Sequence, residues 1–193
     1  DGRTMAATGD NNTVKLWDTD GTELDTLEGH SDIVNSVAYS PDGERLVTAS
    51  WDSTVKLWDA DGTFIKTLAG HGDAVNSVAY SPDGETLATA SRDNTVKLWR
   101  MDGTELNTLE GHSAEVTSVV YSPDGQILAS ASSDNTVKLW DMDGTELNTL
   151  EGHSAEVTSV VYSPDGQVLA SASSDNTVKL WNFDFKTLMT KGC

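Results

Sequence analysis

The feature that most constrains this chain is a repeat of 41 residues. Three markers share the period: the pair Gly-His, the tetrapeptide SPDG and the pentapeptide TVKLW. The pentapeptide ends at Trp17, Trp58, Trp99, Trp140 and Trp181, and all four histidines of the chain belong to the Gly-His pairs. A period of this length indicates one supersecondary unit per repeat, with the apolar faces of neighbouring units packed against one another.

Each repeat predicts four short antiparallel strands, named a to d in chain order. In the second repeat, strand a is expected at 33–39, where Val and Tyr precede the turn that begins at Ser40. Proline and glycine in that SPDG turn favour a sharp reversal of the chain. The remaining strands are expected at 45–50, 54–58 and 63–68, separated by the turns Trp51-Asp52-Ser53 and Asp59-Ala60-Asp61-Gly62.

The order of these markers resembles the WD-repeat family: Gly-His, then about 27 residues, then Trp-Asp. The resemblance implies an all-β propeller, with strand a innermost beside a central channel and the d-to-a and b-to-c loops on one face, called the top. The expected fold has four complete four-stranded blades and a three-stranded first blade, as part of a larger ring. The expected ranges are 1–29 for the partial first blade, then 30–70, 71–111, 112–152 and 153–193.

The ends of the chain determine this blade count. Asp1-Gly2 aligns with the second half of an SPDG turn, so the first blade is expected to contain strands b, c and d only. After Trp181, the segment 182–188 is expected to form the last strand d. No strand would then remain to complete the first blade.

The resemblance also implies a hydrogen-bonded group of four side chains in each complete blade. If the b-to-c turn centres on residues 52 to 54, Thr48 lies opposite Trp58, and Ser50 is the alternative hydroxyl. The first blade has Ala7 and Asn11 at two of these positions and lacks the histidine. The expected tetrads are His30, Thr48, Asp52 and Trp58; His71, Thr89, Asp93 and Trp99; His112, Ser130, Asp134 and Trp140; and His153, Ser171, Asp175 and Trp181.

Histidine, carboxylate and hydroxyl together also fit a catalytic triad. The structural interpretation is favoured because an active site is normally built once, whereas this set recurs in four blades. The c-to-d turns, such as Asp18-Thr19-Asp20-Gly21, resemble the start of a calcium loop, but two carboxylates fall short of the six to eight oxygens that calcium prefers. Asx-type turns are favoured there. The chain is therefore expected to be no enzyme and to bind neither metal nor cofactor.

Charge, cysteine content and hydrophobicity restrict the class of partner and the cellular location that are expected. A net charge of −19 disfavours nucleic acid, which needs a basic surface, and favours basic or neutral proteins. Cys193 is the only cysteine, so no intrachain disulfide can form. With no apolar stretch near 20 residues and no signal segment, the chain is expected to be cytoplasmic and free of the membrane.

Differences among the repeats indicate a binding face. The copies 101–141 and 142–182 differ at two positions, whereas the earlier copies vary around their d-to-a loops, the starts of strand a and the b-to-c turns. Trp51 and Arg92 stand in those turns without a role in a tetrad, and aromatic and Arg residues often anchor interfaces. The expected binding residues on the top face are Trp51, Arg92, Asp32, Ile33, Asp73 and Glu115.

Two functions follow from this pattern. The first is a protein-interaction or sensing platform that binds a protein or peptide on the top face, as the recognition module of a larger bacterial signalling or defence protein. The segment 183–188 and the residues after it resemble the closing part of WD-repeat arrays in large bacterial proteins. The alternative is an architectural role, as a designed or amplified repeat protein that self-associates to complete a ring.

Overall fold

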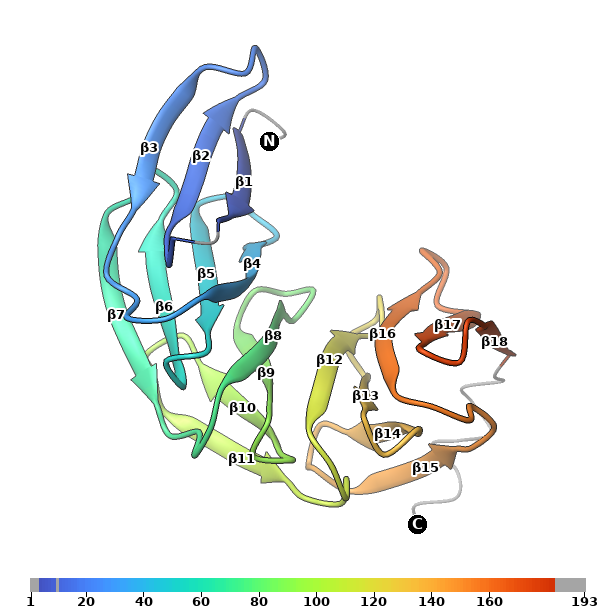
Figure 1. Cartoon of the computed structure of the whole chain (residues 1–193). Helices are drawn as coiled ribbons and strands as arrows, with labels where there is room; N and C mark the ends of the chain where they lie inside the picture. Colours follow the sequence, from blue (N-terminus) through green and yellow to red (C-terminus); the bar gives the residue numbers. More distant parts are fainter. Residues whose placement is uncertain (1–3, 10, 183–193) are drawn as a thin grey trace.

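The chain is all-β in a computed structural model that describes residues 4–9 and 11–182. Within these residues, five antiparallel sheets follow one another along the chain (Figure 1). Their strands are β1 (Thr4–Thr8), β2 (Val14–Asp18), β3 (Glu23–Leu27); β4 (Val34–Tyr39), β5 (Arg45–Ser50), β6 (Thr54–Asp59), β7 (Phe64–Ala69); β8 (Val75–Tyr80), β9 (Thr86–Ser91), β10 (Val96–Arg100), β11 (Glu105–Leu109); β12 (Val116–Tyr121), β13 (Ile127–Ser132), β14 (Val137–Asp141), β15 (Glu146–Leu150); and β16 (Val157–Tyr162), β17 (Val168–Ser173), β18 (Val178–Asn182).

Each sheet is one blade and lies within one of the expected ranges. Blades 2, 3 and 4 have four strands in sequence order, and blade 1 has the three strands β1 to β3. Blade 5 shows β16 to β18, and its expected strand d at 182–188 lies outside the described residues from 183 onward. In blade 2, strands a and d both begin one residue later than expected, at Val34 and Phe64.

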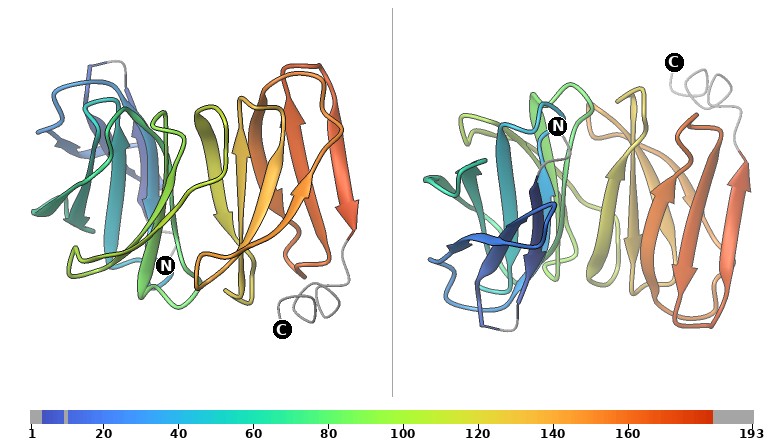
Figure 2. Two further views of the ribbon diagram at one scale, coloured as in Figure 1. Left: turned by 90° about the horizontal axis from the view of Figure 1, so that it is seen from below. Right: turned by 90° about the horizontal axis from the view of Figure 1, so that it is seen from above.

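The blades stand side by side in an open arc, with blades 1 and 5 apart at its two ends (Figure 1). Seen from the side, the loops gather on two opposite faces (Figure 2). On the top face, the d-to-a loop contacts the b-to-c turn. In blade 2, for example, the Trp51 N–H donates to the Ile33 carbonyl at 2.9 Å. On the bottom face, the c-to-d turn meets the a-to-b turn through the Ala60 N–H and the Glu44 carbonyl at 2.9 Å.

The buried core of the described residues consists of four clusters, one at each junction between neighbouring blades. At the junction between blades 4 and 5, Val137 and Leu139 of β14 belong to one buried cluster with Val160 and Leu169 of blade 5. The other three junctions repeat this arrangement. Because each fully buried aliphatic side chain contributes roughly 1.5 to 3 kcal/mol, the junctions hold the blades together without a disulfide.

The b-to-c turns contain a backbone conformation that most residues avoid. Ser53 has φ 66°, and Asn94, Asn135 and Asn176 occupy the same position with φ of 70°, 71° and 65°. The left-handed region is costly for most L-residues, whereas asparagine tolerates it through local hydrogen bonding. Ser53 is therefore the least suited residue among these turns.

We expect Ser53→Asn to raise the free energy of unfolding by about 0.5 to 1 kcal/mol, because it relieves this conformational cost. Urea unfolding followed by tryptophan fluorescence measures the change. The reverse substitution Asn135→Ser in blade 4 is the matched control and should lower stability by a similar amount. Equal stability of Ser53→Asn and the parent would contradict the turn assignment.

Candidate functional site

The four side chains of each expected tetrad are joined by hydrogen bonds. In blade 4, His112 Nδ1 lies 2.8 Å from Asp134 Oδ2, and His112 Nε2 lies 2.8 Å from Ser130 Oγ. The Trp140 indole N–H donates to the same Oγ at 2.8 Å. Blades 2, 3 and 5 show the same three contacts at 2.7 to 2.9 Å.

The donors and acceptors in this network determine which atoms carry the hydrogens. The hydroxyl of Ser130 accepts from Trp140, so its own hydrogen is directed at His112 Nε2, which must then be an acceptor. Nδ1 of His112 therefore carries the proton and donates it to Asp134. Ser130 has no exposed surface, so its oxygen is closed to a substrate as well as bonded on both sides. This geometry is that of a satisfied structural network.

The strand register corrects the expected position of the hydroxyl. Thr48 lies opposite Lys56, and Trp58 lies opposite Leu46. Thr48 and Trp58 still share a sheet face, and the indole reaches the hydroxyl along the diagonal at 2.9 Å. The alternative hydroxyl, Ser50, donates instead to the carbonyl of Asp32 at 3.0 Å.

Sequence reasoning missed a further member of each network. Thr54, Thr95, Thr136 and Thr177 donate through Oγ1 to the tetrad carboxylate at 2.6 to 2.7 Å. The signal was available, because threonine stands two residues after each tetrad aspartate. In blade 1, Thr13 donates to Asn11 in the same way at 2.8 Å, although that blade has no histidine.

The Gly-His pair also has a steric basis. Gly111 has φ 157°, and a Cβ at this position would lie 3.1 Å from the Trp140 ring. Glycine therefore lets the d-to-a loop pass close to the tetrad tryptophan.

Burial and hydrogen bonding change the pKa values of several tetrad side chains. It lowers the pKa of His30, His71 and His112 below the ordinary 6.5, and the hydrogen bond to the aspartate offsets part of this effect. Burial alone would raise the pKa of Asp52 and Asp93. Hydrogen bonds from the neighbouring threonine, a backbone N–H and the histidine outweigh it and lower both values to about 2.

The free energy of unfolding is therefore expected to fall on acidification. Because the pKa values of His30, His71 and His112 are lower in the folded state than in the unfolded chain, their contribution to stability is complete above about pH 7 and declines as the unfolded chain takes up protons toward pH 5. A second loss follows below about pH 4, where the unfolded carboxyls protonate before Asp52 and Asp93. Urea unfolding at each pH measures both losses of stability. His112→Gln should weaken the change between pH 7 and pH 5, and an unaltered change would contradict the role of the neutral imidazole.

A second group of residues lines a pocket on the top face. We call it the top pocket: a cavity of about 220 Å³ lined by Asn35, Trp51, Asn76, Arg92, Glu115, Thr117, Glu156 and Thr158. The Arg92 guanidinium carbon lies 4.3 Å from the centre of the Trp51 ring, and Arg92 Nε lies 3.1 Å from a Glu115 carboxylate oxygen. Three neighbouring blades thus meet through one cation–π contact and one ion pair.

The ion pair in the top pocket is weak. Arg92 and Glu115 are each more than a third exposed, so their ion pair contributes at most about 1 kcal/mol. The Trp51 indole nitrogen is buried and has no hydrogen-bond partner among the described residues. An unsatisfied buried donor of this kind lowers the stability of the fold.

Three of the expected binding residues lie outside this pocket. Asp32 accepts the N–H of Ile33 at 2.7 Å, and Asp73 accepts the N–H of Ala74 at 2.6 Å. Both carboxylates therefore bond to the backbone of their own loops. Ile33 contributes its carbonyl to the b-to-c turn. The structure brings together Trp51, Arg92 and Glu115 from the expected set.

Strands a of blades 2 to 5 supply most of the pocket residues that were not expected, and Glu156 lies just before β16. Asn35 donates to the Asn76 carbonyl at 2.8 Å, Asn76 donates to the Val116 carbonyl at 3.0 Å, and Thr117 donates to the Val157 carbonyl. Each bond joins one blade to the next and fixes the pocket floor. The start of strand a varies among the repeats, which indicated that this region is part of the binding face. The sequence does not show which residues of neighbouring blades come together in one pocket.

The aspartates of the c-to-d turns accept hydrogen bonds from the backbone of the same turns. Asp18 Oδ1 accepts the N–H groups of Asp20 and Thr22 at 3.0 and 2.9 Å, as in an Asx-type turn. Gly21 adopts φ 81° in the same turn. Among residues 4–9 and 11–182, no group of three or more His, Cys, Asp or Glu side chains is arranged to hold a metal ion.

The fold and its networks together define a class of protein. Four-stranded antiparallel sheets in an arc, each with a His–hydroxyl–Asp–Trp network, are blades of the β-propeller type. The chain belongs to the WD40 family: the sequence model described as WD domain, G-beta repeat matches residues 1–18, 21–59, 62–100, 103–141 and 144–182. Domains of this family generally serve as non-catalytic scaffolds for protein interaction.

One curated relative is an uncharacterized WD repeat-containing protein of Synechocystis sp. (strain ATCC 27184 / PCC 6803 / Kazusa). It is 46% identical to this chain over 50 residues, which cover 26% of this chain and 14% of the relative. Within the described part of this chain, no helix has the length and apolar character to cross a membrane.

Proposed function

We propose that this chain is a non-catalytic recognition platform that binds a protein or peptide segment in the top pocket. The observation that carries the proposal is the convergence of Trp51, Arg92 and Glu115 from three neighbouring blades. Aromatic and Arg side chains dominate the energetics of protein interfaces. The framework beneath them is held by buried tetrads, so the pocket is a rigid holder for exposed side chains.

The size and charge of the top pocket indicate its occupant. A cavity of about 220 Å³ is smaller than a typical small-molecule site and matches one or two side chains of a peptide. Glu115 and Glu156 line it in a chain of net charge −19, which favours a basic or neutral segment.

The platform is proposed to serve as the recognition module of a larger bacterial signalling or defence protein in the cytoplasm. The matched segment is a small part of the Synechocystis relative, which is consistent with repeats of this kind within longer chains. Acidic partners and nucleic acid are disfavoured by the charge.

Selection from a displayed library of random peptides tests the proposal. We expect the chain to enrich peptides that share a motif with a basic or aromatic anchor and that compete with one another for one site. Arg100→Asp is the matched control, because it copies Asp59 and Asp141 and alters a cavity on the bottom face. Binding that survives Arg100→Asp supports the top pocket. Failure to enrich any peptide, or loss of binding in that control, would contradict it.

A further inference from the structure

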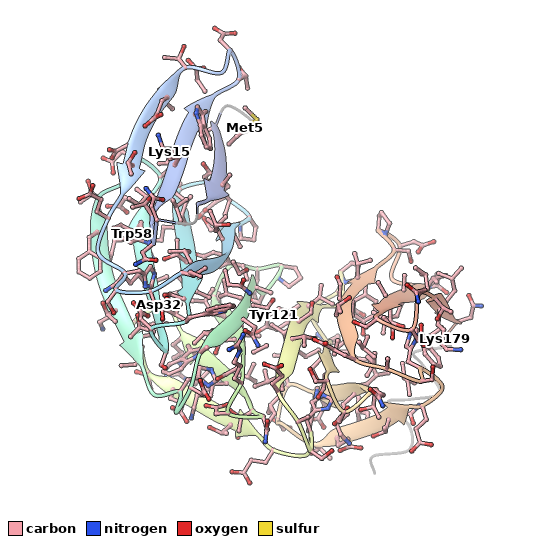
Figure 3. The ribbon with its side chains drawn as sticks, in the orientation of Figure 1. Met5, Lys15, Asp32, Trp58, Tyr121 and Lys179 are labelled. Atoms are coloured by element: carbon pink, nitrogen blue, oxygen red, sulfur yellow. The ribbon has the colours of Figure 1, made fainter. Side chains whose placement is uncertain are left out.

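The outer strand of blade 2 differs from those of blades 1, 3 and 4 in one exposed side chain. Strands β3, β11 and β15 begin with Glu at the position where β7 carries Phe64. The Phe64 ring is 51% exposed and packs edge to face against the Trp58 ring of β6, with 5.5 Å between the ring centres. Figure 3 labels Trp58 in blade 2, toward the convex side of the arc. An aromatic ring therefore lies on the surface of blade 2 where the other three blades present a carboxylate.

The change from Glu to Phe leaves a lysine of the neighbouring strand without a carboxylate. In blade 1, Lys15, labelled in Figure 3, donates to Glu23 at 2.7 Å. The corresponding lysines of blades 3 and 4 make the same ion pair at 2.8 Å. In blade 2, Lys56 Nζ donates to the Thr67 hydroxyl at 2.9 Å and lies 5.3 Å from the centre of the Phe64 ring. Among the described residues, Lys56 forms no ion pair, so its charge is not neutralised.

Strand β7 also has a free backbone edge. Among the strands that the structure describes, β7 pairs with β6 alone, and Figure 1 shows its other edge on the convex side of the arc. Edge strands are commonly protected by charged side chains. The one charged residue of β7, Lys66, donates to the Asp102 carbonyl of blade 3, and its neighbour Ile65 is 42% exposed. An unpaired edge and exposed apolar side chains therefore occur together on β7.

We propose that β7 binds an extended segment of a partner protein, which adds a fifth strand to blade 2 and places a carboxylate against Lys56. Hydrogen bonds between the backbones supply affinity in such a complex, and side chains supply specificity. Residues opposite one another on adjacent strands have Cβ atoms about 4.5 to 5.5 Å apart. Because Lys56 Nζ already lies at Thr67, a carboxylate opposite Thr67 can reach it. It would take the part that Glu105 plays for Lys97 in blade 3.

The charges around β7 determine the chemistry of the bound segment. One positive charge beside exposed apolar side chains matches one carboxylate flanked by aliphatic residues. The net charge of −19 disfavours a segment that carries several carboxylates. The site shares no residue with the top pocket, so each can be tested without the other.

Selection of the full chain against two displayed peptide libraries tests the proposal. Both libraries alternate Val, Ile or Leu with Thr, and they differ at one central apolar position, which is Glu in one library and Gln in the other. Neither contains the basic and aromatic anchors expected at the top pocket. We expect the chain to enrich peptides from the Glu library alone, because only a carboxylate forms a charge-assisted bond with Lys56. Enrichment from neither library, or equally from both, would overturn the proposal.

Three variants locate the site of an enriched peptide. Phe64→Glu copies blades 1, 3 and 4 and should weaken the peptide at least tenfold, because the new carboxylate pairs with Lys56. Leu106→Glu is the matched control, since it adds the same charge to an exposed side chain of β11, and it should leave the affinity unchanged. Glu105→Phe should free Lys97 and create a second site, so that calorimetry gives two peptides per chain in place of one.

Full affinity in Phe64→Glu, or one peptide per chain in Glu105→Phe, would show that the site lies elsewhere. A loss of affinity in Leu106→Glu would show that overall charge controls binding, which also contradicts the proposal. Sedimentation of the wild-type chain tests a different occupant of β7. If the chain associates with itself and Phe64→Glu abolishes the association, a second copy occupies this edge and the proposal is wrong.

Discussion

Trp140→Ala should lower the free energy of unfolding by about 3 to 5 kcal/mol, the largest stability effect expected in this chain. The substitution removes a side chain that is 1% exposed and packs in the junction with blade 3. It also leaves the Ser130 hydroxyl without the indole donor. Urea unfolding monitored by circular dichroism measures the loss.

Two further variants separate packing from hydrogen bonding. His112→Ala keeps the tryptophan and breaks the network, so it should lower stability by roughly 1 to 3 kcal/mol. Trp17→Ala is the matched control, because blade 1 has no tetrad and its tryptophan is half-buried. Its effect should be smaller than that of Trp140→Ala. A His112→Ala variant as stable as the parent would contradict the role assigned to the tetrads.

The largest effect on binding is expected from the double variant Trp51→Ser and Arg92→Ser. It copies Ser133 and Ser174 of blades 4 and 5, so the turn retains residues that the repeat already accommodates. Loss of the ring and the guanidinium should weaken a selected peptide by about 2 kcal/mol or more, which is about thirtyfold. Titration calorimetry measures the affinity.

The double variant should leave stability nearly unchanged, because neither side chain belongs to a tetrad or a buried cluster. Equal affinity of the parent and the double variant would place the binding site elsewhere. A parallel loss of affinity and stability would instead indicate that the substitutions disturb the blades.

The period and the turn residues were sufficient to predict the β-fold. Val-rich segments between SPDG and Asp-Gly turns leave few alternatives to short antiparallel strands, and 45–50 is a strand with the expected bounds. The register was less predictable, because it depends on turn conformation. The turn centres on Asp52, with Ser53 in the left-handed region, and this shifts the partner of Thr48 from Trp58 to Lys56.

The binding residues could be predicted only in part for a related reason. Trp51 and Arg92 stood out as departures from the repeat, and the structure places them in contact. Asp32 and Asp73 looked equally variable, but a loop aspartate that accepts a neighbouring backbone N–H is indistinguishable in sequence from one that faces a partner. Asn35 and Asn76 act between blades, and that contact depends on how adjacent blades are spaced.

The location of a bound peptide tests the central claim most directly. Amide and indole resonances of the chain, followed by NMR during titration with a selected peptide, report that location. Trp51 lines the top pocket, so its indole resonance should shift most, together with the amides of Arg92 and Thr117. Trp51→Ser assigns that resonance by its disappearance. Shifts confined to Arg100, Met101 and Asp102 on the bottom face, with the Trp51 indole unmoved, would contradict the account.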